Sequence, residues 1–195
     1  MQPNIINNRT NWLNSPVNSG FFRHYLIDKG SLTRRLQLRS RHFSVQLVRM
    51  RMAKPLQDEI AILSLKPQQH AFLRDVLLVC DGTSMIFAHS VLPKKSLRGE
   101  WRRLAHLGNK PLGATLFANP KVQRRSLTYK KLSCHHKLYK YIMEKTNILS
   151  GLSTNQAQFN RDLWARRSIF SLDKLGYSHE RILVTEVFFP SILNL

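Results

Sequence analysis

Two apolar segments joined by an Asp-Gly pair constrain the fold of this chain more than any other feature. Residues 72–93 read FLRDVLLVC, then Asp81 and Gly82, then TSMIFAHSVLP. Both turn positions tolerate a positive φ, which lets a two-residue turn match the twist of its flanking strands. The segment therefore predicts a β-hairpin, and a hairpin predicts an antiparallel sheet.

A charged residue lies on an otherwise apolar face of this hairpin. Side chains of a strand alternate between its two faces, so Phe72, Arg74, Val76 and Leu78 share one face. A buried guanidinium without a partner costs several kcal/mol. The sequence therefore requires a partner or a ligand for Arg74.

The last predicted strand repeats this pattern with the opposite charge. Ile182, Val184, Glu186 and Phe188 share a face, so Glu186 also has apolar neighbours. A carboxyl in such a setting has a raised pKa unless a cation compensates. Arg74 and Glu186 could pair with each other in the core. Alternatively both face a closed cavity, where Arg74 binds an anion and Glu186 binds or moves a proton.

The remaining patterns predict an α+β fold, with an antiparallel sheet and helices on one side of it. Residues 1–18, rich in Asn and Ser, are expected to be poorly ordered, and residues 19–195 to form one domain. The expected strands are 42–52, 72–80, 83–93, 122–132, 165–175 and 181–190; the expected helices are 21–27, 32–38, 96–107, a short turn through Phe117 and an amphipathic segment from Leu138; and 54–69, with two prolines, is expected to be irregular.

The net charge of +20 predicts attraction to anions, which include small acidic metabolites, nucleic acid and anionic lipid.

Cys80 and Cys134 form no spaced framework, which is typical of a reducing cytoplasm. The first residues contain no apolar signal segment, and no apolar run is long enough for a transmembrane helix. The adjacent residues Cys134, His135 and His136 are a weak metal signal, and we expect no metal site.

Two short segments are candidate carboxylate sites. Gly30-Ser31-Leu32-Thr33 and Lys110-Pro111-Leu112-Gly113 each open a predicted short helix, although such segments are more often plain turns. The first backbone N–H groups of a helix lack intrahelical partners and carry the positive end of its dipole. The main chain at Leu32 and Leu112 could therefore bind an anion, and their apolar side chains could form a lid.

Four stretches, in this order, resemble bacterial chorismate pyruvate-lyase. They are GSLTRRL (30–36), LRDVLLVCDG (73–82), LGNKPLGATLF (107–117) and LVTEVFFP (183–190), and WARRSIF (164–170) matches the Trp/Arg-rich strand of that family. The resemblance implies a lyase that converts chorismate to 4-hydroxybenzoate and pyruvate, the first committed step toward ubiquinone. It also implies an antiparallel sheet of about six strands, with the product buried beneath two helical flaps.

The resemblance assigns roles to the residues already singled out. Arg74 would hold the ring carboxylate together with main-chain N–H groups of Leu32 and Leu112, and Glu186 would meet the hydroxyl end. The catalytic pair would be Glu186 and Arg74, with no cofactor and no metal. Leu32 stands where Met is typical, and His89 replaces an Arg of some members, so the charge behind the site could differ.

The resemblance also implies slow release of 4-hydroxybenzoate, and hence product inhibition, in a cytoplasmic enzyme that we expect to be monomeric. The basic insertion at about 130–162 departs from the family, and contact of this segment with a membrane surface or a downstream enzyme stays open. One alternative is a small-anion sensor domain of the same fold, although about 20 N-terminal residues are too few to supply a DNA-binding domain. The other is a basic nucleic-acid-binding protein; we expect no specific nucleic acid partner.

Overall fold

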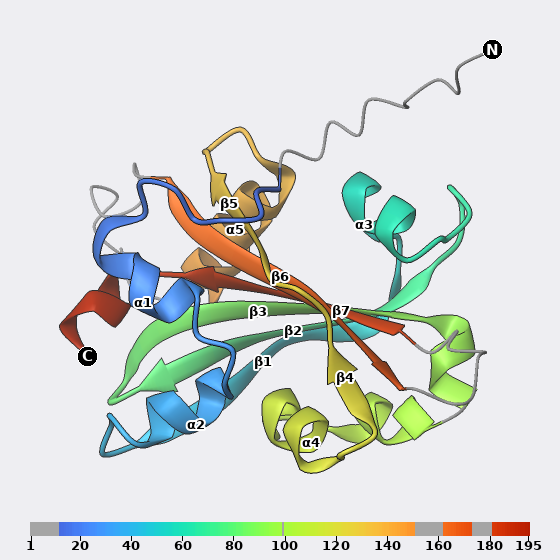
Figure 1. Ribbon diagram of the computed structural model, residues 1–195, viewed down its shortest axis with the longest axis horizontal. Coiled ribbons are helices and arrows are strands. Elements are labelled where there is room, and N and C mark those ends of the chain that lie inside the picture. Colours follow the sequence, from blue (N-terminus) through green and yellow to red (C-terminus); the bar gives the residue numbers. More distant parts are fainter. Residues whose placement is uncertain (1–11, 99, 151–161, 173–180) are drawn as a thin grey trace.

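One antiparallel sheet of seven strands organises the protein in the computed structural model, which describes residues 12–98, 100–150, 162–172 and 181–195 (Figure 1). The strand order is β1-β2-β3-β7-β6-β4, and β5 also pairs with β6. The strands are β1 (Phe43–Ala53), β2 (Ala71–Cys80), β3 (Thr83–Pro93), β4 (Val122–Arg124), β5 (Thr128–Leu132), β6 (Leu163–Leu172) and β7 (Arg181–Phe188). The α+β fold with an antiparallel sheet is therefore confirmed.

The hairpin predicted at the centre of the sheet is present as β2 and β3. Asp81 and Gly82 have φ values of 48° and 79°, so both turn residues adopt the left-handed conformation that a two-residue hairpin turn needs. Cys80 pairs with Thr83 across the turn, and Arg74 pairs with Ser90 farther along. β3 then pairs with β7, so β3 lies between the strand that carries Arg74 and the strand that carries Glu186.

Short helices cover the face of the sheet that carries Arg74 and Glu186, called here the site face. Leu32 and Leu36 pack there against Val76, and Leu112 packs against Val184 in a neighbouring cluster. The helices and 3-10 turns on this side are η1 (Gly20–Phe22), α1 (Arg23–Leu26), α2 (Leu32–Gln37), η2 (Lys94–Arg98), η3 (Glu100–His106), α4 (Leu112–Ala118) and η5 (Pro190–Asn194).

Two further helices lie on the opposite face, behind the sheet as seen from the site. Ile142 of α5 (Lys137–Ser150) packs against Phe87 and Val187, while Leu63, just after α3 (Gln57–Ile62), packs against Leu73. The sheet is thus covered on both faces, whereas the sequence predicted helices on one side. The apolar face of the amphipathic segment from Leu138 is accounted for by this packing.

Three local predictions were wrong in detail. The segment 54–69 is not wholly irregular, because it contains α3. Pro55 precedes this helix, and the Glu59 carboxylate accepts a hydrogen bond from the Leu56 N–H (2.8 Å) at its start. The segment 96–107 forms two 3-10 turns, although Trp101 and Leu104 are buried as expected. The single strand expected at 122–132 is divided into β4 and β5, both paired with β6, which explains seven strands in place of about six.

Parts of several predictions fall outside the described residues. These are the expected disorder of 1–11, the end of the basic segment at 151–161, and the turn of the last hairpin at 173–180. Residues 12 and 13 are described: the Leu13 backbone exchanges hydrogen bonds with that of Tyr129 (2.7 and 2.8 Å). Within the described part of the chain, no helix is both long and apolar enough to cross a membrane.

Candidate active site

A small cavity lies between the site face of the sheet and the N-terminal ends of α2 and α4. All four residues singled out in the sequence, Leu32, Arg74, Leu112 and Glu186, line it. Its floor consists of strand residues, and its roof consists of residues of the two short helices. The other lining residues are Thr33, Val76, Leu78, Ala88, Ser90, Pro111, Gly113, Leu116, Phe117, Arg124, Phe170 and Val184.

The cavity exists because the strand between Arg74 and Glu186 carries small side chains. Arg74 pairs with Ser90 on β3, and Glu186 pairs with Ala88, so the two charged groups lie in adjacent rows on either side of β3. Larger residues at these two positions would fill the space between the charges. The alternation read from the sequence thus gives a floor that is polar at its ends and small in its middle.

Arg74 is almost completely buried, with 2% of its surface exposed. Its Nη2 donates hydrogen bonds to the carbonyl oxygens of Gly108 (2.9 Å) and Lys110 (2.6 Å), in the loop that leads into α4. Burial lowers the pKa of Arg74 to about 10, which still leaves it charged at neutral pH. Its Nε has no hydrogen-bond partner among the described residues. The guanidinium is therefore fixed to the α4 loop and keeps a donor for a ligand.

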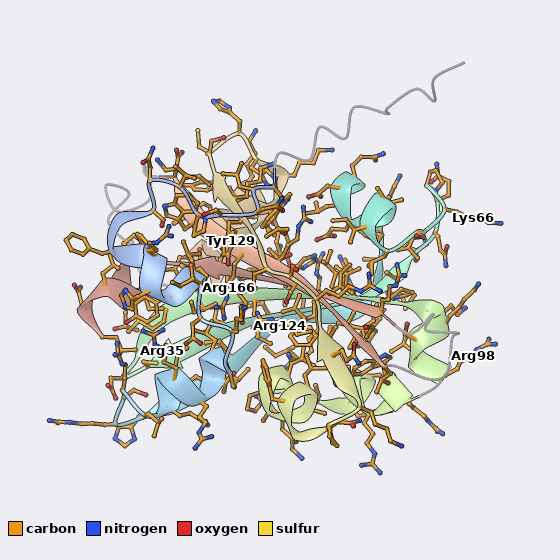
Figure 2. The ribbon with its side chains drawn as sticks, viewed as in Figure 1. Arg35, Lys66, Arg98, Arg124, Tyr129 and Arg166 are labelled. Carbon is orange, nitrogen blue, oxygen red and sulfur yellow. The ribbon has the colours of Figure 1, made fainter. Side chains whose placement is uncertain are left out.

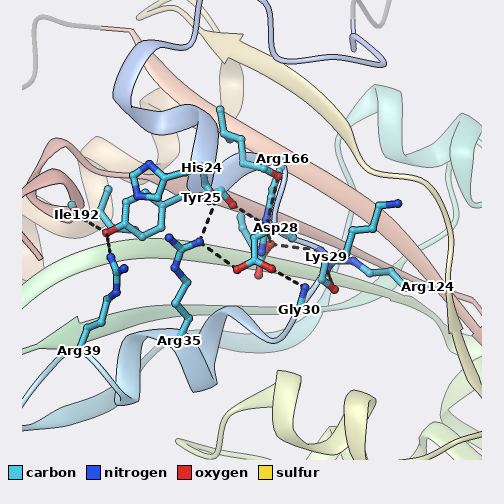
Figure 3. Close-up of polar contacts among 12 residues, drawn as sticks. His24, Tyr25, Asp28, Lys29, Gly30, Arg35, Arg39, Arg124, Arg166 and Ile192 are labelled. Carbon is cyan, nitrogen blue, oxygen red and sulfur yellow. Dashed lines mark hydrogen bonds and ion pairs between the residues drawn. The ribbon is translucent and has the colours of Figure 1, made fainter.

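Glu186 does not pair with Arg74, so the alternative of a simple core ion pair is wrong. Its Oε2 accepts a hydrogen bond from Arg166 Nε (2.6 Å), and Arg166 lies directly opposite on β6. Arg166 is fully buried, and its Nη1 also donates to the carbonyl oxygens of Tyr25 (2.8 Å), Leu26 (3.3 Å) and Asp28 (2.6 Å), as Figure 3 shows in part. This arginine is the compensating cation that the setting of Glu186 required.

Arg124 is a second cation at the cavity that the sequence reasoning missed. Its Nη2 lies 3.7 Å from Glu186 Oε2, and its guanidinium lies over the rings of Phe117 and Phe170, at 5.8 and 5.2 Å from the centroids. Burial lowers the pKa of Arg124, and the nearby Glu186 partly offsets this. Strand alternation alone would have placed Val122 and Arg124 on one face, but a three-residue strand is too short to show a period.

The charges around the cavity do not balance. Among the described residues, the guanidinium groups of Arg74, Arg124 and Arg166 face one carboxylate, that of Glu186, which leaves two positive charges uncompensated. The nearby Asp28 carboxylate also attracts Arg124 and Arg166, but the Arg35 guanidinium with which it pairs (3.0 Å) balances its charge. The site is therefore electrostatically suited to a doubly charged anion.

The two helices that roof the cavity nearly touch. A Cβ built on Gly113 at the start of α4 would lie 3.2 Å from Thr33 Oγ1 in α2. The cavity beneath measures about 40 Å³. A single water takes about 10–15 Å³ on this scale, so an aromatic acid needs more room. The arrangement of α2 and α4 in this structure therefore leaves room for only a few waters beneath them.

A buried ionic cluster lies on the opposite face, directly behind the site. His89 contacts the Asp75 carboxylate through Nδ1 and the Glu59 carboxylate through Nε2 (3.0 Å), and Asp75 also accepts hydrogen bonds from Arg49 Nε (2.6 Å) and the Tyr141 hydroxyl (3.0 Å). Burial opposes the charged imidazole, but the two carboxylates outweigh it and raise the pKa of His89 to about 10. His89 therefore carries the positive charge that an arginine would carry there.

The fold and the cavity together define a class: an α+β protein with a small cavity of excess positive charge beneath two short helices. Comparison with known proteins narrows this class. The chorismate lyase family model matches residues 6–194. A probable chorismate pyruvate-lyase of Methylobacillus flagellatus is 42% identical over 187 residues, covering 96% of this chain and 97% of that protein. Its counterpart in Nitrosospira multiformis is 44% identical, covering 89% and 88%. The chain belongs to the chorismate lyase family.

Solved structures share the fold at much lower identity. The effector domain of PhnF from Mycobacterium smegmatis has a TM-score of 0.51 and is 11% identical, covering 83% of this chain and 90% of that one. At this level of identity, the likeness concerns the fold alone.

Proposed function

We propose that this member of the chorismate lyase family converts chorismate to 4-hydroxybenzoate and pyruvate in the cavity beneath α2 and α4. The bond between the ring carbon and the ether oxygen breaks, and the neighbouring ring carbon loses its proton. The enolpyruvate that leaves takes up a proton at its methylene carbon and becomes pyruvate. The ring becomes aromatic without net electron transfer, so the balance requires no redox cofactor. The observation that supports this most directly is the excess of two positive charges around the cavity, because chorismate is a dianion.

In this proposal, Arg74 binds the ring carboxylate. The support is its buried Nε without a protein partner in the described residues, together with its fixed position beside the loop that opens α4. Main-chain N–H groups of Leu32 and Leu112, at the starts of the two roofing helices, complete the carboxylate site. Closure of the helices over the ring would then form the carboxylate site and exclude water in one step.

Glu186 then meets the other end of the ring, where the hydroxyl and the breaking ether lie. The hydrogen bond from Arg166 Nε fixes the Glu186 carboxylate at the edge of the cavity that it lines. We assign Glu186 the proton transfer at the ring C–H or at the ether oxygen, while the cavity holds the substrate in a reactive conformer.

The remaining features of the proposal concern product release, the cellular compartment and the oligomeric state. A product held beneath two contacting helices should leave slowly, so 4-hydroxybenzoate should inhibit the enzyme. The free thiols of Cys80 and Cys134 support a cytoplasmic setting. We propose a monomer, and the basic exterior is compatible with weak contact to an anionic membrane or a downstream enzyme.

A single assay tests the proposal. The purified chain is incubated with chorismate and no added cofactor, and 4-hydroxybenzoate is followed in the ultraviolet while pyruvate is measured separately. We expect equal amounts of the two products. A chain that binds chorismate without converting it would be a sensor of the same fold. Retention on DNA that falls steeply with salt would indicate only non-specific attraction.

A further inference from the structure

We infer that Arg124 binds the enolpyruvyl carboxylate of chorismate and is thereby the residue that distinguishes the dianionic substrate from the monoanionic product. This inference rests on the proposed orientation, with the ring carboxylate on Arg74. It adds a residue to the site and assigns the second of the two excess charges.

The geometry of the cavity identifies Arg124 by elimination among its cations. Arg74 is fixed at the α4 end of the cavity by two carbonyl oxygens. Arg166 is fully buried and does not line the cavity. Its Nε and Nη1 donate to Glu186 and to three carbonyl oxygens, and its Nη2 is buried without a hydrogen-bond partner among the described residues. Arg124 lines the cavity, and 13% of its side chain is exposed. It is therefore the cation that a second carboxylate at the Glu186 end can reach.

Two hydrogen bonds, and not a close ion pair, hold the Arg124 guanidinium in place. Its Nε donates to Ser168 Oγ (2.8 Å), and its Nη1 donates to the Lys29 carbonyl oxygen (3.2 Å), a contact visible in Figure 3. Its other terminal nitrogen, Nη2, lies 3.7 Å from Glu186, beyond hydrogen-bond distance. The guanidinium is thus oriented before substrate arrives and retains the capacity to bind an anion.

The same position suits the chemistry of the substrate. The enolpyruvyl group is attached to the ring carbon next to the hydroxyl-bearing carbon, so its carboxylate must lie near Glu186 if the hydroxyl does. Two carboxylates placed side by side repel each other unless a cation stands between them. Arg124 borders both positions, and its contact with Lys29 links it to the segment that precedes α2.

The test compares ligands that share the ring carboxylate and differ in the second one. Arg124→Gln should raise KM for chorismate at least about tenfold, as expected when one partner of a largely buried charge pair is lost. The affinity for 4-hydroxybenzoate, which lacks the enolpyruvyl carboxylate, should change less than about threefold. Arg125→Gln is the matched control, because Arg125 is exposed and adjacent, and it should leave both values unchanged.

A second measurement needs only the unaltered protein as its reference. 3-(Carboxymethoxy)benzoate and 3-methoxybenzoate carry the same ring carboxylate, but only the first has a carboxylate on the ether arm. The first should inhibit at least about tenfold more strongly in the unaltered protein, and Arg124→Gln should abolish this advantage.

The possible outcomes are separable. Equal losses of chorismate and 4-hydroxybenzoate affinity in Arg124→Gln would make Arg124 a structural residue and overturn the inference. The inference would also be overturned if 3-(carboxymethoxy)benzoate still inhibited Arg124→Gln more strongly than 3-methoxybenzoate does, because another group would then be binding that carboxylate. Unchanged affinity for 4-hydroxybenzoate in Arg74→Ala would instead refute the proposed orientation, and a lack of chorismate turnover would refute the proposed function.

Discussion

At the scale of single residues, we propose different roles for Glu186 and Arg74, which line the same cavity. For Glu186→Gln, we expect turnover to fall by roughly 10²-fold or more, because the amide cannot accept the proton. The affinity for 4-hydroxybenzoate should change much less, since the amide can still bond the hydroxyl. Single-turnover kinetics with chorismate measures the first quantity and product titration the second. Near-normal turnover would leave Glu186 with a binding role only.

Arg74→Ala should act on binding. Losing one partner of a buried charge pair costs about 2–5 kcal/mol, and 4-hydroxybenzoate affinity should weaken accordingly. Equilibrium titration of the variant measures this loss. Arg98→Ala is the matched control, because Arg98 is exposed and points outward at the edge of the molecule in Figure 2. Thermal melting of both variants separates a binding defect from a folding defect.

At the scale of elements, the contact between α2 and α4 should control release of the product. Gly113→Ala adds a Cβ that would lie 3.2 Å from Thr33 Oγ1, so the closed pair of helices is disfavoured relative to the open pair. We expect faster dissociation of 4-hydroxybenzoate and progress curves that stay linear for longer, measured by stopped-flow displacement and by turnover.

A second substitution at the same contact should reverse the effect of Gly113→Ala. Thr33→Ala removes the oxygen that the new methyl group would meet, so the double variant should release product at a rate closer to that of the unaltered protein. If the dissociation rate is the same in all three proteins, closure of these helices does not limit release.

At the scale of the whole molecule, the buried cluster behind the site ties the stability of the sheet to pH. His89 has a folded pKa of about 10 against an ordinary 6.5, so its stabilisation is fully present below pH 6.5 and is lost as pH rises through 10. The pKa of Asp75 is lowered because His89, Arg49 and Tyr141 together outweigh the effect of burial. Its contribution is therefore present above about pH 3.8 and is lost as pH falls further.

Urea unfolding from pH 5 to 10.5 measures this dependence. The free energy of unfolding should decline by a few kcal/mol between pH 6.5 and 10, and His89→Arg, which keeps the charge at every pH, should remove most of that decline. An identical decline in both proteins would mean that groups other than His89 cause it.

The features that could be predicted from the sequence alone are those that depend on neighbouring residues. The hairpin, with its Asp81-Gly82 turn, and the facing of Arg74 and Glu186 depend on dihedral preferences and on the two-residue period of a strand. Those properties belong to a few neighbouring residues, so they could be read directly. The resemblance of ordered motifs then pointed to the right family, although the roles of the site residues remain predictions.

The partners of those charges were decided by tertiary structure. Arg166 lies opposite Glu186 only because β6 pairs with β7 in one register, and Arg124 reaches the cavity only because the three-residue β4 adds to the edge of β6. Pairing register between distant strands depends on the packing of the whole sheet, which no local pattern encodes. Local preferences therefore determined which residues face the interior, and long-range packing determined which charges meet there.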